Sequence, residues 1–405
     1  MVQGKIEIVL LLWMMVLMLS DGTSTYRIET QVLKDTGGVN GTITHFVHDS
    51  LSNVFYVGAI NRIYKLSSSL EVQQQLVTGP EQDNVLCLDT CTRDKVLTNN
   101  YNKILLIEKN INGNNRLIVC GSLFQGYCER LDLNNISRRI STESNSKLVA
   151  NEGNASTVGL IVTRGLSENV MYIGASYPIT TACVDETNAN VLKLLRQDVP
   201  ALSMRRLTDL DTFTLYQKDK DFSQTSASAL RLNLDDIIKY VIDFVSAFSV
   251  GNFTYFLTVQ PYYLTPNCLV DYQTQKLLPS QSKISLTCHI DTHFYSYVEI
   301  PLNCIENDTN FNFVSAGKSI IPGQTLRNAM GISDEILVAL FQKRHNDGRI
   351  DSAVCVYSLS NIRKIMKENL KKCSEGDLRL QGKRFVGGAS CTQVCRSILQ
   401  IKRAF

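Results

Sequence analysis

Asn53-Val-Phe-Tyr-Val-Gly-Ala59 is the first of five similar stretches in a chain of 405 residues. Each stretch begins with a polar residue and continues as a tight run that is rich in β-prone apolar residues. In the first three stretches the run ends in Gly, followed by Ala or Ser. The other four stretches are Arg116–Ser122, Asn169–Ala175, Asn252–Val259 and Glu335–Phe341.

Apolar runs of this length predict β-strands that are buried on both faces, and the Gly predicts a place where backbones approach closely. Three more β-prone segments surround the first run, at Thr42–Val47, Arg62–Leu66 and Val72–Val77. Groups of four short strands that recur every ~50–80 residues are typical of β-propeller blades. We therefore predict an all-β propeller. The alternative is an α/β protein with buried core strands, but few segments have a helical period.

Two segments depart from the β pattern. Ala201–Asp236 is polar and is predicted to be a long surface excursion, a kind of segment that often carries binding residues. Ser360–Lys372 is predicted to be a short, basic surface helix. The residues expected to share one face of that helix are Ile362, Ile365, Met366, Asn369 and Leu370.

The composition predicts a folded protein with a sizeable core, because 44% of the residues are hydrophobic and 20% are charged. The 41 basic and 38 acidic side chains leave a net charge of only +3. So small a surplus gives no reason to expect nucleic acid as a partner.

Residues 1–24 are predicted to be a secretory signal peptide. Lys5 supplies the positive start, and Ile8–Leu19 is an apolar run that is shorter than a membrane-spanning helix. Small residues at Ser20, Gly22 and Ser24 suit cleavage. The alternative is an uncleaved membrane anchor. No later stretch reaches spanning length, so we expect no transmembrane helix in the rest of the chain.

The chain has 12 cysteines, and an even number behind a signal peptide predicts six disulfides. Spacing alone does not choose the pairs. The alternative is zinc, because Cys87-x3-Cys91 and Cys391-x3-Cys395 resemble half-sites, although no further ligands lie at close spacing. N-glycosylation is predicted at five N-x-[ST] sequons, which are Asn40, Asn135, Asn154, Asn252 and Asn307.

Catalytic motifs are weak. The sequence has no G-x-S-x-G elbow, and Ala316-Gly-Lys-Ser319 lacks the first Gly of a phosphate loop. The pairs His45/His48 and His289/His293 are interpreted as ordinary histidines, and Asp209 and Asp211 as solvated carboxylates. We therefore expect no metal and no cofactor.

The chain resembles the sema domain, and within that family it is similar to the plexins. The resemblance runs from about Tyr26 to about Cys391, and it is greatest to the A-type plexins. Five ordered motifs carry it: Asn53–Leu66, Val77-Thr-Gly-Pro80 with Asp83-Asn84, Cys120-Gly-Ser-Leu-Phe-Gln-Gly-Tyr-Cys128, Tyr295–Cys304 and Ser352–Leu359.

The resemblance implies a seven-bladed propeller, of which the chain is expected to contain about five to six blades. The expected division is a signal peptide at 1–24, an incomplete sema domain at 25–391 and a divergent tail at 392–405. A complete plexin continues with cysteine-rich PSI and IPT modules, a membrane span and a cytoplasmic GTPase-activating region.

The resemblance also implies disulfide pairs. These are Cys120–Cys128, Cys304–Cys355 and Cys373–Cys391, with Cys87–Cys91 as a tighter fourth pair. Cys288 is expected to pair with Cys395. Cys183 and Cys268 remain as candidates for a last bridge.

The implied function is that of a non-enzymatic, ligand-binding ectodomain of a semaphorin receptor, acting in signalling such as axon guidance. Its partners would be semaphorins, and it would reach the outer face of the plasma membrane through the secretory pathway. Membrane contact would come only from the C-terminal span of the complete receptor. Two alternatives are a secreted propeller hydrolase and a semaphorin or Met-type sema protein. A converged polar pocket at the propeller axis would favour the hydrolase.

Overall fold

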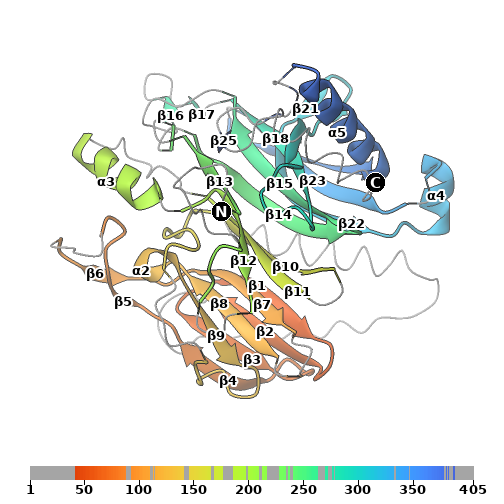
Figure 1. The fold of residues 1–405 in the computed structure, drawn as a ribbon. Helices are drawn as coiled ribbons and strands as arrows, with labels where there is room; N and C mark the ends of the chain where they lie inside the picture. The colour runs from red at the N-terminus through yellow and green to blue at the C-terminus, as the bar shows by residue number, and fades with distance from the viewer. Residues whose placement is uncertain are drawn as a thin grey trace.

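The fold is described from a computed structural model (Figure 1). It covers residues 42–387, except for 88–92, 110–112, 114, 141–145, 166–167, 177–185, 198, 209–211, 217–227, 234–235, 238–239, 263–269, 272–275, 278, 333, 346, 378–379, 381 and 383–385. The predicted signal peptide and the predicted divergent tail both lie outside the described residues.

Antiparallel sheets of three to five strands account for most of the fold, which confirms the all-β prediction. The first is β1 (Ile43–Asp49), β2 (Val54–Ala59), β3 (Arg62–Leu66) and β4 (Val72–Val77), and the second is β7 (Asn102–Glu108), β8 (Arg116–Gly121) and β9 (Tyr127–Asp132). The third is β10 (Thr157–Arg164), β11 (Glu168–Ala175), β12 (Leu202–Arg206), β13 (Ala229–Leu232) and β25 (Val386–Gly387). The fourth is β14 (Asp243–Val250), β15 (Phe253–Pro261), β18 (Ser280–Cys288) and β19 (Val298–Pro301). The fifth is β22 (Phe313–Ile320), β23 (Ile336–Arg344) and β24 (Ile350–Ser358).

Short ladders and helices connect these sheets. The ladders are β5 (Glu81–Asp83) with β6 (Val96–Thr98), β16 (Val270–Asp271) with β17 (Lys276–Leu277), and β20 (Cys304–Glu306) with β21 (Thr309–Phe311). The helices are α2 (Leu123–Gly126), α3 (Glu186–Gln197), α4 (Gln324–Met330) and α5 (Leu359–Ser374). None of the described helices combines the length and the hydropathy that a bilayer crossing needs.

The first strand of each sheet lies beside the first strand of the next. β1 lies beside β7, β7 beside β10, β10 beside β14, and β14 beside β22. The sheets are therefore arranged as successive blades, with these five strands on the inner side (Figure 1). The described series ends at the β1 sheet on one side and at the β22 sheet on the other.

The five repeated stretches are the second strands of their sheets, namely β2, β8, β11, β15 and β23. The second strand of each sheet is hydrogen-bonded to a strand on either side, and a neighbouring blade packs against its face. These contacts favour its burial. β15 is buried along all of its length. β23 alternates between buried and half-buried residues, because it belongs to the sheet at the end of the described series.

Two of the three repeat glycines, Gly58 and Gly174, are explained by close contact with the next blade, as predicted, whereas Gly121 approaches the side chain of Asn100, just before β7 of its own sheet. A Cβ at Gly58 would collide with the side-chain amide of Asn102 on β7. A Cβ at Gly174 would lie 2.5 Å from Cδ1 of Phe244 on β14. Only Gly lets the second strand of one sheet approach the first strand of the next sheet this closely.

Two predictions about irregular segments have different outcomes. The basic helix is confirmed as α5, but Ile365 is 48% exposed and does not belong to the buried face. The prediction of a surface excursion at 201–236 is wrong over two parts, because β12 and β13 lie within it. Ser203 and Arg205 of β12 are buried, with Arg205 Nε donating to Ser203 Oγ at 3.0 Å, whereas Arg206 at the end of the strand is exposed.

Candidate functional site

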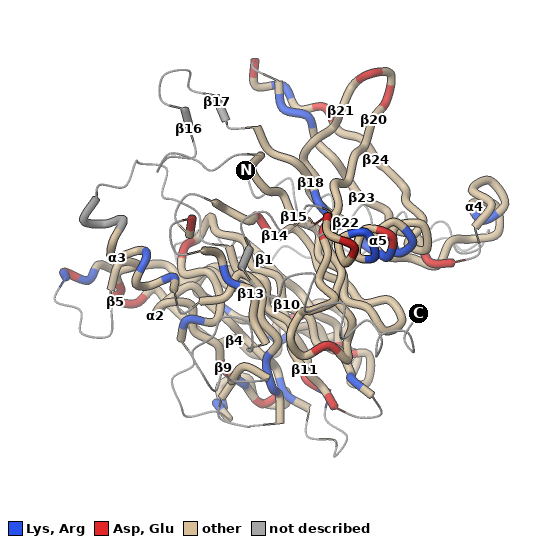
Figure 2. Tube along the Cα trace, turned by 45° about the horizontal axis from the view of Figure 1, so that its top comes forward, with Lys and Arg blue, Asp and Glu red and all other residues tan. Residues whose placement is uncertain are grey.

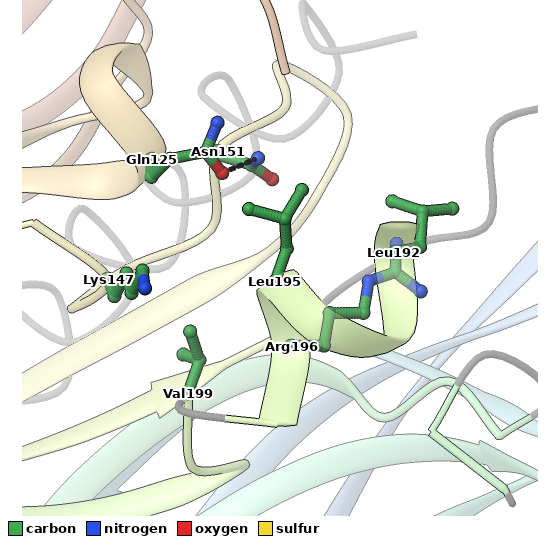
Figure 3. A pocket seen from close by; sticks show the side chains of 7 residues that line it. All are labelled: Gln125, Lys147, Asn151, Leu192, Leu195, Arg196 and Val199. Atoms are coloured by element: carbon green, nitrogen blue, oxygen red, sulfur yellow. Dashed lines mark hydrogen bonds between the residues drawn. The ribbon is translucent and has the colours of Figure 1, made fainter. Parts of the chain in front are cut away.

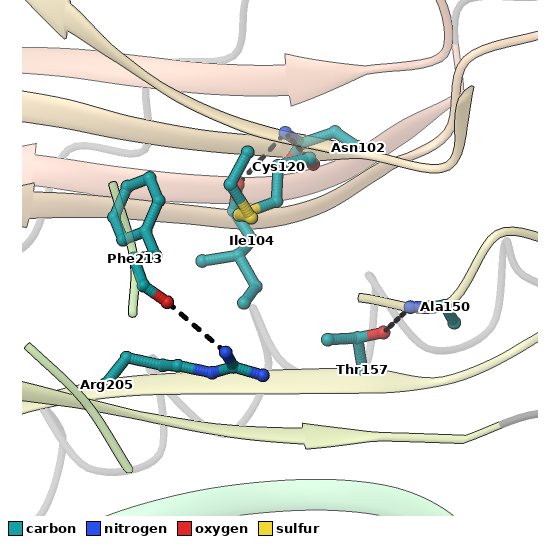
Figure 4. Close-up of a disulfide and its surroundings, with 8 residues drawn as sticks. Asn102, Ile104, Cys120, Ala150, Thr157, Arg205 and Phe213 are labelled. Atoms are coloured by element: carbon teal, nitrogen blue, oxygen red, sulfur yellow. Dashed lines mark hydrogen bonds between the residues drawn. A yellow bond between two sulfur atoms is a disulfide. The ribbon is translucent and has the colours of Figure 1, made fainter. Parts of the chain in front are cut away.

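The Cys120–Cys128 disulfide lies between the second and third blades. Cys120 and Cys128 face each other across β8 and β9, with their Cα atoms 4.0 Å apart. Both residues are fully buried, and Ile104 of β7 lies beside the bridge (Figure 4). The bridge therefore closes the α2 loop, Leu123–Gly126, at its base.

The Cys304–Cys355 disulfide joins β20 to β24, so it links the end of the fourth unit to the fifth blade, with Cα atoms 5.9 Å apart. Cys87 and Cys373 are also disulfide-bonded. Their expected partners lie outside the described residues, as do three further cysteines of the predicted framework. The cysteines outside the described residues are Cys91, Cys183, Cys268, Cys391 and Cys395.

Cys288 is a free, buried thiol, which differs from the expected pairing with Cys395. It ends β18 in the core of the fourth and fifth blades, among side chains such as Leu286 and Val298. Burial raises the pKa of this thiol to about 12, although a hydrogen bond with Ser296 lowers it. The thiolate is therefore disfavoured, and Cys288 is not a reactive nucleophile in this fold.

The sequons are accessible wherever the structure describes them. Asn135, Asn154, Asn252 and Asn307 are all exposed. Asn252 lies at the tip of the β14–β15 hairpin, and Asn307 at the tip of the β20–β21 hairpin. Asn40 lies outside the described residues. Glycans at the four described positions could therefore extend from the surface without disturbing buried residues.

The inner strands carry ionisable side chains that no sequence motif singled out. Lys103 on β7 is buried, and its Nζ donates to the carbonyls of Ala155 at 2.7 Å and Gly153 at 3.1 Å. Burial lowers the pKa of Lys103 to about 8. Burial, with the charge of Lys103 as the next cause, lowers the pKa of His45 on β1 to about 4.

Two other inner-strand charges, Glu108 and Arg164, also have structural partners. Glu108 on β7 accepts from Nε of Arg130 at 2.8 Å inside the second blade. Arg164 on β10 donates from Nε to the carbonyl of His289 at 2.6 Å, which joins the third blade to the fourth. These groups hold neighbouring strands together, and they do not converge as an acid–base pair.

A pocket lies beside α3 rather than on the inner strands (Figure 3). Asn151 Nδ2 donates to Gln125 Oε1 at 2.9 Å at its edge. The lining contains no carboxylate and no histidine, so it offers no acid–base pair. Its residues are Gln125, Lys147, Asn151, Leu192, Leu195, Arg196 and Val199.

Metal ligands do not gather among the residues that the structure describes, where no three His, Cys, Asp or Glu side chains are grouped. His45 and His48 lie on β1, and His289 and His293 follow β18. His289 Nε2 is hydrogen-bonded with Ser249 Oγ at 3.2 Å, and His293 stacks on Tyr295. Asp209 and Asp211 lie outside the described residues.

The α2 loop has an unusual backbone that the sequence did not reveal. Phe124 and Gln125 have φ values of 52° and 63°, in the left-handed region that non-glycine residues rarely adopt. Phe124 N–H donates to Asp83 Oδ2 at 2.8 Å, and Gln125 Nε2 donates to the carbonyls of Asn84 and Val85 at 3.3 Å. These bonds fix the loop against β5.

This fixed loop presents an exposed apolar edge, which we call the α2–β6 edge and define as Val96, Leu97 and Phe124. Phe124 is 50% exposed and Leu97 is 66% exposed. Val96 pairs with Asp83, the residue that accepts the Phe124 N–H. Strained backbone that holds an exposed aromatic side chain is typical of binding sites.

Comparison with known proteins identifies similar chains. The profile of the Sema domain matches residues 320–390. Plexin-A4 of Mus musculus is 32% identical over 352 residues, which is 82% of this chain and 17% of that protein. Plexin-A2 of Homo sapiens is 31% identical over 356 residues, which is 84% of this chain and 18% of that protein. The chain thus spans less than a fifth of the length of these two relatives.

Solved structures show the same similarity. The extracellular region of plexin A4 superposes with a TM-score of 0.68 at 31% identity, covering 84% of this chain and 36% of that one. Drosophila Semaphorin 1a superposes with a TM-score of 0.50 at 19% identity, covering 81% of this chain and 55% of that one. The second likeness concerns the fold alone.

Proposed function

Because this chain belongs to the plexin family through its sema domain, we propose that it is the ligand-binding part of a semaphorin receptor. The observation that carries the proposal is the 32% identity with plexin-A4 over 82% of the chain, together with the shared propeller fold. The partner is a protein, and its class is the semaphorins. The biological setting would be semaphorin–plexin signalling such as axon guidance.

The proposed role needs a docking surface and no cofactor. An interface of ordinary size buries about 1,200–2,000 Å² in total and depends on a few apolar or aromatic anchors. The α2–β6 edge supplies such anchors, because Leu97 is exposed on strand β6 and Phe124 is exposed on the α2 loop, where its N–H donates to Asp83. We include this edge in the semaphorin-binding surface.

The experiment measures binding of the secreted chain to semaphorin sema domains by surface plasmon resonance. The test variant is Phe124→Ala/Leu97→Ala. The control is Leu51→Ala, which removes an apolar side chain that is 75% exposed at the β1–β2 turn. We expect the test variant to weaken binding at least tenfold, because anchor residues contribute about 2 kcal/mol or more.

Two results would contradict these assignments separately. Unchanged affinity in the double variant would remove the α2–β6 edge from the interface but leave the receptor role standing. No binding of any semaphorin at micromolar concentration by the unmodified, cooperatively folding chain would overturn the receptor role itself.

The same proposal covers localisation and domain division. We assign residues 1–24 to a signal peptide, 25–391 to the sema domain and 392–405 to a divergent tail. Two disulfides among described residues and four exposed sequons support passage through an oxidising secretory pathway. Endoglycosidase digestion of the expressed chain, with N-terminal sequencing of the product, tests both assignments.

The hydrolase alternative is disfavoured by how the inner-strand charges are used. Lys103, Glu108 and Arg164 are each occupied by a structural partner, and the α3 pocket has no carboxylate. A hydrolase would need two carboxylates, or a nucleophile and a base, around one substrate-sized pocket. We therefore propose recognition without catalysis.

A further inference from the structure

Helix α5 concentrates positive charge on one side. Its 16 residues include five basic side chains between positions 363 and 372 and a single acidic one, Glu368. The chain as a whole has a net charge of only +3. A patch on one helix can therefore present a strong local field that the overall charge does not reveal. The basic residues are Arg363, Lys364, Lys367, Lys371 and Lys372.

Packing forces these lysines outward. The helix lies against β19 and β24 and buries Ile362, Met366 and Leu370 in the core of the fourth and fifth blades. At 100° per residue, Lys364 and Lys371 are on the side opposite this buried stripe. Figure 2 shows that Lys and Arg positions gather along α5. Lys364, Lys367, Lys371 and Lys372 are all exposed.

The patch is held rigidly at both ends. Ser358 caps the N-terminus of the helix, its side chain accepting from the Asn361 N–H at 3.2 Å. Cys373, in the last turn, is buried and disulfide-bonded. Successive lysines from Lys364 to Lys371 are about 4–6 Å apart along the axis, which is within the ~8 Å Debye length at physiological salt. Their fields therefore add at the surface.

Lys364, Lys371 and Lys372 lie outside the ion pairs that the structure describes. Among the described ion pairs, α5 contributes Arg363, which approaches Asp334 at 4.0 Å, and none includes Lys364, Lys371 or Lys372. Favourable interaction with the helix dipole accounts for lysines in the last turn only. It does not account for Lys364 and Lys367, which lie in the middle of the helix.

We propose that the exposed face of α5 binds a sulfated polysaccharide of the heparan sulfate class. Runs rich in Lys and Arg form heparin-binding patches, and a linear row of lysines on a rigid helix fits an extended chain of sulfates. The inference rests on the extracellular location proposed above, which the disulfides and exposed sequons support and where such polysaccharides occur and nucleic acid does not. This site is separate from the α2–β6 edge.

An anionic membrane surface is the competing occupant. Helices that lie on membranes insert their apolar face, but the apolar face of α5 is already buried in the protein. Ile365 is the single large apolar residue that α5 exposes among the described residues. A polysaccharide is therefore favoured over a membrane as the ligand of α5. Binding to anionic vesicles is measured in parallel as a test of the membrane alternative.

The experiment measures binding of the full chain to immobilised heparin between 0.05 and ~0.5 M NaCl. The test variant is Lys364→Gln/Lys371→Gln/Lys372→Gln. The charge-matched control is Lys95→Gln/Arg138→Gln/Arg206→Gln, at three exposed positions in other parts of the structure. A third variant, Lys364→Arg/Lys371→Arg/Lys372→Arg, retains the charge. Parallel arms use unsulfated heparosan and phosphatidylserine vesicles.

We expect the test variant to weaken heparin binding at least tenfold at ~0.15 M salt and to reduce the slope of log K against log salt by about 2–3. The control and arginine variants should bind like the unmodified chain, and heparosan should bind poorly. Equal weakening in test and control variants, no heparin binding by the unmodified chain, or binding to vesicles but not to heparin would each overturn the proposal.

Discussion

Lys283 Nζ lies 2.9 Å from Glu299 Oε2 in a salt bridge that is buried between the last two strands of the fourth blade. The Glu299 side chain is 1% exposed and the Lys283 side chain 7%. Tyr297 O–H donates to the other carboxylate oxygen at 2.5 Å, and burial raises the pKa of this tyrosine. The carboxylate is thus satisfied on both oxygens without water.

The first prediction concerns this pair. Glu299→Gln should lower the free energy of unfolding by about 3–5 kcal/mol, because it leaves the Lys283 charge buried without its partner. The apolar double variant Lys283→Met/Glu299→Leu should lose less than the single variant. Urea unfolding followed by fluorescence measures both. A loss below about 1 kcal/mol in Glu299→Gln would show that the bridge is dispensable.

The second prediction concerns the bridge at the base of the α2 loop. Cys120→Ala/Cys128→Ala should destabilise the chain by about 2–3 kcal/mol, because it restores conformational freedom to a short loop of the unfolded chain. It should also weaken semaphorin binding, since the bridge supports the loop that holds Phe124. Denaturant midpoints with an unchanged slope measure the first effect. An unchanged midpoint would contradict it.

The third prediction concerns pH. The pKa of His45 is about 4 in the folded chain and ordinarily 6.5, so the folded state disfavours the protonated ring. Stability from this group is complete above pH ~6.5 and is lost as pH falls from 6.5 toward 4, by up to about 3 kcal/mol. The pKa of His289 is lowered too, chiefly by burial, and acts in the same direction.

Variants of β1 separate His45 from other acid-sensitive groups. His45→Gln should reduce the loss of melting temperature between pH 7 and pH 4.5. His48→Gln, on the same strand but with an exposed side chain, should retain the loss seen in the unmodified chain. Identical pH profiles for all three chains would rule out His45 as a source of acid sensitivity.

The fourth prediction concerns the sequons. Asn252→Gln and Asn307→Gln should each remove one glycan without changing the melting temperature by more than about 1 °C, because both residues are exposed at hairpin tips. Mass spectrometry of the secreted chain measures occupancy. A sequon that carries no glycan in the chain without substitutions would contradict the prediction for that position.

The propeller was predictable because its signal is local. The run in β11 is apolar on both faces, since neighbouring blades cover both, and Gly58 and Gly174 mark contacts between blades. The position of such runs within each sheet was not predictable. The inner strand β10 is half-buried at most positions although it contains the apolar run Val158–Val162, so apolar runs alone do not distinguish inner strands from second strands.

The polar interior and the α2 loop were harder to predict. Arg205 and Ser203 on β12 are buried and hydrogen-bonded to each other, so this segment forms a strand although its sequence is polar. Phe124 and Gln125 adopt a backbone that their residue types disfavour, because bonds from Asp83 and Asn84 hold them there. Neither arrangement follows from composition or period. The buried Arg205 depends on a hydroxyl that the strand brings to the same face, and the α2 loop depends on Asp83, which lies 41 residues earlier in the chain.

β25 also has a kinetic consequence. It pairs with β13, although the two strands are about 150 residues apart in sequence. Just before β25, the backbone at Gly382 passes so close to the Glu299 carbonyl that a Cβ would collide, and Lys283 Nζ donates to the Gly382 carbonyl at 3.4 Å. This segment therefore spans the third and fourth blades, and it can dock only after both have formed. It should be among the last parts to acquire protection from hydrogen exchange during folding, and its release would loosen two blades at once.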